Sequence, residues 1–162
     1  MLKLVHGDAS AYAGPADFVF THPYAPIPKQ LHGLPMLINL ALPQGQEAKR
    51  IADAERWTGS WLVPLSKWAR GGWNTVFCAN LPPRAVDLTD LEAVEPGWFP
   101  EELPRRLFAL YADLIPPGAV VWDGFMGRGT VGKVALELGY GFVGIDNRAE
   151  RVEAARAYLG AL

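Results

Sequence analysis

The residue types best suited to bind a ligand lie in the last third of the chain. The run Asp123-Gly-Phe-Met-Gly127-Arg-Gly129-Thr130 follows a short apolar segment and precedes a segment with one apolar face. Gly127 and Gly129 allow the backbone to approach a ligand closely and to adopt a positive φ. Asp146 ends the next apolar segment, where a carboxylate can accept hydrogen bonds from ribose hydroxyls. The pattern favours a nucleoside site over a tight connection with two incidental glycines.

The acid at the start of this turn indicates which nucleoside would bind. Asp123 precedes the glycines, and a carboxylate there would repel the pyrophosphate of a dinucleotide. The same carboxylate suits the cationic end of S-adenosylmethionine (SAM). We therefore expect SAM as the cofactor.

Periodicity and turn residues predict a single domain spanning residues 1–162, with an α/β, Rossmann-like doubly wound and mostly parallel sheet. Residues 25–43 are rich in proline and are expected to be mostly loop, with one short helix over 36–40. An edge strand is possible over 85–91. The remaining expected strands are 2–5, 17–20, 73–81, 119–122 and 141–145, and the remaining expected helices are 44–56, 60–69, 100–114, 130–138 and 148–159.

Composition excludes several classes of protein. The 162 residues carry a formal net charge of −2, so nucleic-acid binding would need a local basic patch. Cys78 is the only cysteine, which excludes an intrachain disulfide and favours a cytoplasmic location. No apolar segment is long enough to span a membrane, and the N-terminal residues do not follow the order of a signal peptide.

These motifs together resemble a known family, the DNA amino-methyltransferases in their permuted "beta" arrangement. Thr21-His22-Pro23-Tyr24 resembles the family's catalytic Asp/Asn/Ser-Pro-Pro-Tyr, which precedes the cofactor motifs in the chain. The run from Asp123 to Thr130 is similar to its Asp-Pro-Phe-x-Gly-Ser-Gly-Thr, and Gly144-Ile145-Asp146 to its Gly-Ile-Glu/Asp. Gly7-Asp8 resembles its acid near the adenine ring, and residues 98–104 its helix ahead of the cofactor loop.

The resemblance implies a class I methyltransferase fold with circularly permuted motif order. It implies methyl transfer from SAM to an exocyclic amino group of DNA, adenine-N6 or cytosine-N4, without a metal or a covalent intermediate. The side chain of Thr21 and the carbonyls near His22 and Pro23 would accept hydrogen bonds from the amino group, and Tyr24 would stack on a flipped base. The implied cofactor-binding residues are Asp8, Phe99, Asp123, Phe125, Gly127, Gly129, Thr130 and Asp146.

The chain departs from the family pattern in the catalytic motif, in the cofactor loop and in length. Threonine stands at position 21 and histidine at position 22, and Gly124 and Arg128 replace the usual proline and serine. Residues 25–97 are too few for the usual target-recognition domain, so recognition is expected from loops, a homodimer partner or a separate subunit. Methylation of RNA or a protein amide, and a non-catalytic cofactor-binding subunit, are the alternatives.

Four tryptophans lie in the middle of the chain, at positions 57, 61, 68 and 73, among three basic residues. Such a segment can stack on exposed bases, but it is more often part of a core or a subunit interface.

Overall fold

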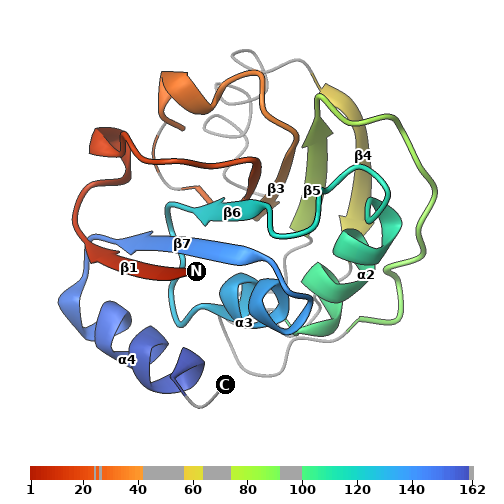
Figure 1. Cartoon of the computed structure of the whole chain (residues 1–162). Helices are drawn as coiled ribbons and strands as arrows, with labels where there is room; N and C mark the ends of the chain where they lie inside the picture. The colour runs from red at the N-terminus through yellow and green to blue at the C-terminus, as the bar shows by residue number, and fades with distance from the viewer. Residues whose placement is uncertain (24, 26, 42–56, 64–73, 92–99, 161–162) are drawn as a thin grey trace.

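A single mixed sheet forms the centre of the computed structural model, which describes residues 1–23, 25, 27–41, 57–63, 74–91 and 100–160 (Figure 1). Within these residues the sheet has seven strands in the order β1-β7-β6-β2-β3-β5-β4. The first five strands in this order are parallel, β5 is antiparallel to β3, and β4 is antiparallel to β5. The strands are β1 (Leu2–His6), β2 (Phe18–Thr21), β3 (Met36–Ala41), β4 (Trp57–Val63), β5 (Asn74–Ala79), β6 (Val120–Asp123) and β7 (Gly141–Asp146).

Within the described parts of the chain, three α-helices lie on the same face of this sheet: α2 (Glu102–Leu110), α3 (Thr130–Glu137) and α4 (Ala149–Leu159) (Figure 1). Their apolar side chains pack against Phe18 and Phe20 of β2, Val121 of β6 and Phe142 of β7. Two short 3-10 helices, η1 (Ala9–Ala11) and η2 (Lys29–Leu31), contribute side chains to the core on the opposite face.

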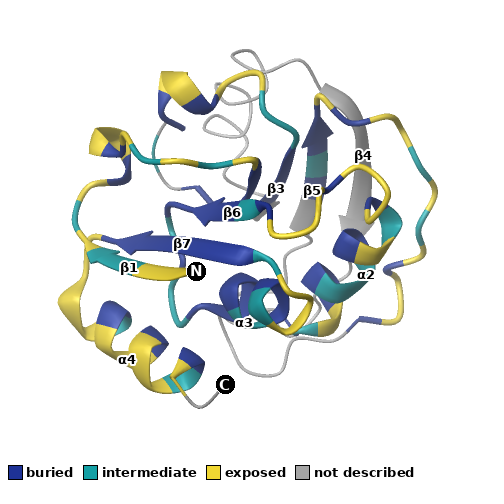
Figure 2. Ribbon diagram, viewed as in Figure 1, coloured by how far each residue is buried: buried dark blue, intermediate teal, exposed yellow. Residues whose placement is uncertain are grey.

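Burial on both faces explains the sequence of the central strands. Successive residues of a strand point to opposite faces, so Val121 belongs to the helix-side core and Trp122 to the opposite core. Every residue of β2 and β7 is buried (Figure 2). Strands buried in this way read as continuous apolar runs, which is the pattern that predicted the parallel sheet.

The structure confirms the expected elements from Val120 to Leu159 and the strands near residues 2–6, 18–21 and 74–79. It contradicts three other expectations. Met36–Ala41 is a strand between β2 and β5 rather than a helix. Trp57–Val63 is the strand β4, so no helix begins at Ser60. Residues 85–91 contain no strand. Short apolar runs fit a buried helix and a buried strand equally well, and for Met36–Ala41 only the neighbouring strands decide.

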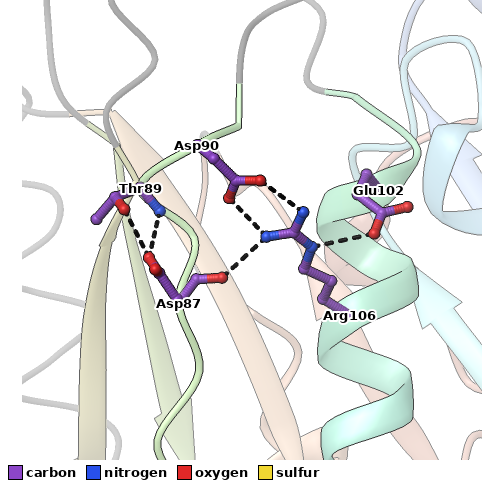
Figure 3. Close-up of polar contacts among 5 residues, drawn as sticks. All are labelled: Asp87, Thr89, Asp90, Glu102 and Arg106. Carbon is purple, nitrogen blue, oxygen red and sulfur yellow. Dashed lines mark hydrogen bonds and ion pairs between the residues drawn. The ribbon is translucent and has the colours of Figure 1, made fainter.

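Two arginines hold the segment 81–91 against the helical layer in place of strand pairing. Arg106 of α2 donates two hydrogen bonds to the carboxylate of Asp90, at 2.6 and 2.8 Å, and one to the carbonyl of Asp87, at 3.0 Å (Figure 3). It also donates to Glu102 one turn away. Arg84 makes a similar two-bond contact with Asp113. The segment is therefore fixed by side chains although its backbone forms no ladder.

Several sequence-based expectations fall outside the described residues. These are the helix over 44–56, the part of the helix 60–69 after residue 63, the side chains of the four tryptophans, and the predicted site residues Tyr24 and Phe99. Across the part of the chain that the structure describes, no helix has the length and apolar character needed to span a membrane.

Candidate functional site

Two of the predicted site residues, Thr21 and Asp123, meet at the carboxyl ends of the neighbouring strands β2 and β6. From β6 the chain runs through α3 to β7 on one side, whereas β2 leads to β3 on the other side. The boundary between β6 and β2 is therefore a topological switch point, where open α/β sheets bind their ligands. Asp123 is the last residue of β6 and Thr21 is the last residue of β2.

The turn after β6 has the backbone that its glycines predict. Gly127 has a φ of 54° and Gly129 has a φ of 90°, both in the left-handed region that favours glycine. Gly127 donates its N–H to Oδ2 of Asp146 at 3.1 Å, and Met126 donates its N–H to the carbonyl of Ile145 at 3.0 Å. The turn is thus tied to the end of β7, and Gly129 begins α3 as its N-cap.

A third glycine, Gly132, allows α3 to lie close to the sheet. A Cβ at this position would lie 2.4 Å from the ring of Phe142, too close for any other residue without displacement. Gly127, Gly129 and Gly132 together have the spacing of a dinucleotide-binding loop, Gly-x-Gly-x-x-Gly. The glycines therefore do not separate a dinucleotide from SAM, and the distinction depends on Asp123.

A pocket of about 600 Å³ opens beside this turn. Asp8, Phe125 and Asp146, three of the residues expected to bind the cofactor, line it. Asp123, Gly127, Gly129 and Thr130 do not line the pocket, although they build the turn and the helix start beside it. Among the described residues, the lining is Gly7, Asp8, Ala9, Ala25, Gly124, Phe125, Asp146, Asn147 and Arg151.

Asp146, at the carboxyl end of β7, is held in place by two backbone N–H groups and a nearby guanidinium group. Its carboxylate accepts backbone hydrogen bonds from Gly127 and Arg148, and its Oδ2 lies 3.6 Å from the guanidinium of Arg151. Sequence reasoning missed Arg151 as a pocket residue. Its position on the first turn of the helix after an acid-ended strand was the signal available for it.

The other acid near the pocket, Asp8, is exposed and caps η1 by accepting a hydrogen bond from the N–H of Ser10 at 2.8 Å. This backbone hydrogen bond lowers the pKa of Asp8, so its carboxylate stays ionised at neutral pH. In the described part of the pocket lining, the charged side chains are the acids Asp8 and Asp146 and the base Arg151.

Thr21 contacts Asp123 directly. Its Oγ1 donates a hydrogen bond to Oδ1 of Asp123 at 2.7 Å, and the N–H of Phe125 donates to the same oxygen at 3.1 Å. Thr21 is 1% exposed and Asp123 is 3% exposed. Burial raises the pKa of Asp123 to about 7, the bonds from Thr21 and Phe125 oppose this shift, and the nearby Asp146 adds to it.

The described residues that follow Thr21 in the predicted catalytic motif are His22 and Pro23. His22 and Pro23 are buried, and Ala25 lines the pocket. Burial lowers the pKa of His22 to about 4, so its imidazole is neutral at physiological pH. The structure thus brings Thr21, Asp123 and the pocket-lining residues of three strand ends into one region.

The family of this chain is shown by its sequence match. The family model described as DNA methylase, of the N6/N4 type, matches residues 44–157, which is more than half of the chain. The chain belongs to the DNA methylase family. The matched segment includes the glycine-rich turn, Asp146 and most of α4.

Solved structures show that this DNA methylase has the class I methyltransferase fold. The M1.HpyAVI–SAM complex superposes with a TM-score of 0.71 at 16% identity, covering 98% of this chain and 100% of that chain. A second M1.HpyAVI structure gives 0.69 at 18% identity, with 98% of each chain covered. The cytosine-N4-specific PvuII DNA methyltransferase gives 0.62 at 15% identity, covering 95% of this chain and 84% of that one.

Proposed function

We propose that this DNA methylase transfers a methyl group from SAM directly to an exocyclic amino group of DNA, on adenine-N6 or cytosine-N4. We also propose that it belongs to the permuted beta class, because β2 with Thr21 precedes β6 with Asp123 in the chain. The observation that carries the proposal is the contact of Thr21, in the motif that resembles the catalytic motif, with Asp123 of the predicted cofactor loop.

The pocket residues fit SAM. A volume of about 600 Å³ is within the range of about 300–1,000 Å³ that holds ligands of this size. Asp146 at the end of β7 is placed to accept ribose hydroxyls, and Asp8 lies at the neighbouring end of β1. Asp123 does not line the pocket itself but ends β6 beside it, and we assign its carboxylate to the cationic methionine end of SAM. Bound there, SAM supplies an electrophilic methyl group on its sulfonium sulfur.

The DNA base that receives the methyl group requires hydrogen-bond acceptors around its amino group. An exocyclic amino group is a weak nucleophile because its lone pair is delocalised into the base. Acceptors around its two N–H bonds localise the lone pair and aim it at the methyl carbon. We assign this role to Oγ1 of Thr21 and to the backbone carbonyls of His22 and Pro23, and base stacking to Tyr24. The new N–CH₃ bond forms as the S–CH₃ bond breaks, and the amino nitrogen releases its proton to solvent.

The neutral state of His22 agrees with this division of roles. A group with a pKa of about 4 is a poor general base at neutral pH, so His22 serves through its backbone carbonyl rather than its imidazole. Direct transfer needs no general base with a pKa near 7 at this position, because the nitrogen becomes acidic only after it has been methylated.

The test uses tritiated SAM with unmethylated genomic DNA, followed by digestion and mass spectrometry of the nucleosides. N6-methyladenine or N4-methylcytosine is expected, and the product identifies the target base. Transfer to RNA or protein instead of DNA contradicts the proposed substrate. Binding of SAM by calorimetry without transfer to any of these acceptors indicates a non-catalytic subunit.

A further inference from the structure

We propose that Asp123 is a positioning residue for Thr21: it takes the hydroxyl hydrogen of Thr21 so that only lone pairs of Oγ1 face the amino group of the base. This inference rests on the proposed function, and it gives one carboxylate a role on both the cofactor side and the acceptor side of the site.

The hydrogen bond fixes which way the Thr21 hydroxyl points. A hydroxyl has one hydrogen to donate and two lone pairs that accept. Because Asp123 takes the hydrogen at 2.7 Å, Oγ1 is left with acceptor capacity alone. An amino group presents N–H donors, so this is the polarity that it needs. A threonine without such a partner could turn its hydrogen toward the base and repel the amino group.

The hydrogen bond between Thr21 and Asp123 also places a negative charge near the amino group of the base. Hydrogen bonds to a carboxylate are shorter and about twice as strong as those between neutral groups, and they raise the electron density on the donor oxygen. In the family that this chain resembles, position 21 often holds the charge itself. Here the charge lies one hydrogen bond away, on β6, and reaches the base through Thr21.

Ionisation of Asp123 controls this arrangement. Its pKa is about 7 because of burial, and the charged group acting on it among the described residues is Asp146 of β7. Once protonated, the carboxyl group becomes a donor and competes for the lone pairs of Oγ1. Methyl transfer is therefore expected to fall as the pH drops below about 7.

A bound cofactor is also expected to affect the ionisation of the Asp123 carboxyl group. Both hydrogen bonds that the described residues donate to Asp123 go to Oδ1, and none of these residues donates to Oδ2. A cation near Oδ2 favours the ionised form and lowers its pKa. A cationic cofactor held beside Asp123 would favour loss of its carboxyl proton to solvent, and the ionised Asp123 would accept the hydroxyl hydrogen of Thr21. Cofactor loading and acceptor geometry are coupled through a single side chain.

Thr21→Val, Thr21→Ser and Asp123→Asn test the inference in the full-length protein. The first measurement needs no activity: the ¹³C NMR shift of the Asp123 carboxyl group is followed against pH. The pKa of this group is expected to rise in Thr21→Val, because a donor that lowers it is lost, and to stay near the wild-type value in Thr21→Ser.

The second measurement is the pH profile of kcat on DNA. We expect Thr21→Val and Asp123→Asn to lower kcat by about 100-fold, the typical effect of removing one such stabilising group, whereas Thr21→Ser retains most activity and the wild-type profile.

The loop at residues 87–89 offers matched controls. Thr89 donates its hydroxyl to Asp87 at 2.6 Å, the same chemical pair on an exposed surface (Figure 3). Thr89→Val and Asp87→Asn are expected to leave kcat and its pH profile unchanged.

The inference and the proposed function fail separately. Wild-type protein that transfers no methyl group to DNA overturns the proposed function, and the NMR titration then still tests the pair. An active wild-type protein whose Asp123 titration and kcat profile are unaltered by Thr21→Val overturns the positioning role alone.

Discussion

The backbone of Gly124 lies directly against the indole ring of Trp122. A Cβ at position 124 would be 2.2 Å from one ring carbon of Trp122 and 2.9 Å from the Cβ of Ala9. Trp122 is fully buried, so its ring has no space into which it can move. This contact explains why glycine stands at position 124 of the predicted cofactor loop, where the family pattern has proline.

Replacement of Gly124 by alanine is therefore expected to destabilise the protein by about 1–3 kcal/mol, the usual cost of overpacking a well-packed core. It should also weaken SAM binding, because Gly124 lines the pocket. Urea denaturation and calorimetry measure the two effects. Gly7→Ala is the matched control for stability, since its Cβ would meet only Val5, at an ordinary 3.8 Å. Equal stability of the two variants would contradict the steric account.

Asp123→Asn is expected to be more stable than the wild type at high pH. The folded protein raises the pKa of Asp123 from 3.8 to about 7, so folding favours the protonated form. This contribution is fully present below about pH 4 and is lost as the pH rises to about 7. At pH 8 the ionised side chain costs about 4 kcal/mol, and the neutral amide avoids most of that cost.

The measurement is the difference in free energy of unfolding between Asp123→Asn and wild type at pH 5 and pH 8. The difference should grow in favour of the variant as the pH rises. Asp113→Asn, on the exposed pair with Arg84, is the control and should show no such gain. A difference that shrinks toward pH 8 is incompatible with a raised pKa.

Asp146→Asn is expected to weaken SAM binding by about 10- to 100-fold, because hydrogen bonds to a charged acceptor contribute about 1.5–3 kcal/mol. Calorimetry with SAM measures this directly. Asp87→Asn lies outside the pocket and should bind SAM as the wild type does. Unchanged affinity in Asp146→Asn would exclude the pocket beside β7 as the ribose site.

Arg106→Gln is expected to lower the Tm without changing SAM affinity. The variant loses the two-bond contact with Asp90 that ties the segment 81–91 to α2 (Figure 3). Because the pair is partly exposed, salt should weaken the wild-type contact and reduce the difference in Tm. Thermal melts at low and high salt check this. A loss of SAM binding would show that the contact between Arg106 and Asp90 also supports the site.

The local sequence pattern was enough to predict the secondary structure of the C-terminal half of the site. Val120–Asp123, the glycine turn, α3 and β7 follow one another closely in the chain, and each is shaped by its own residues. An apolar strand, glycines with positive φ and an amphipathic helix are encoded within a few residues of one another. The DNA methylase family and SAM as the expected cofactor followed from this segment and from the order of the other motifs.

Strand order decided what the sequence left open. Met36–Ala41 is apolar and short, and it is a strand because β2 and β5 provide hydrogen-bonding edges on both sides. Residues 85–91 have no such edge and are held by arginines instead. A local pattern carries no information about a partner strand far away in the chain.

The sequence by itself determined the turn between Asp123 and Asp146, because its backbone and charges are local properties. Only the tertiary structure decided that Thr21 and Asp123 share a hydrogen bond. These residues are far apart in the chain, and they meet because β2 and β6 lie side by side and end at the same edge of the sheet. The tertiary structure also decided that Asp123 is buried there, which is the physical reason for its raised pKa and for the roles that we assign to it.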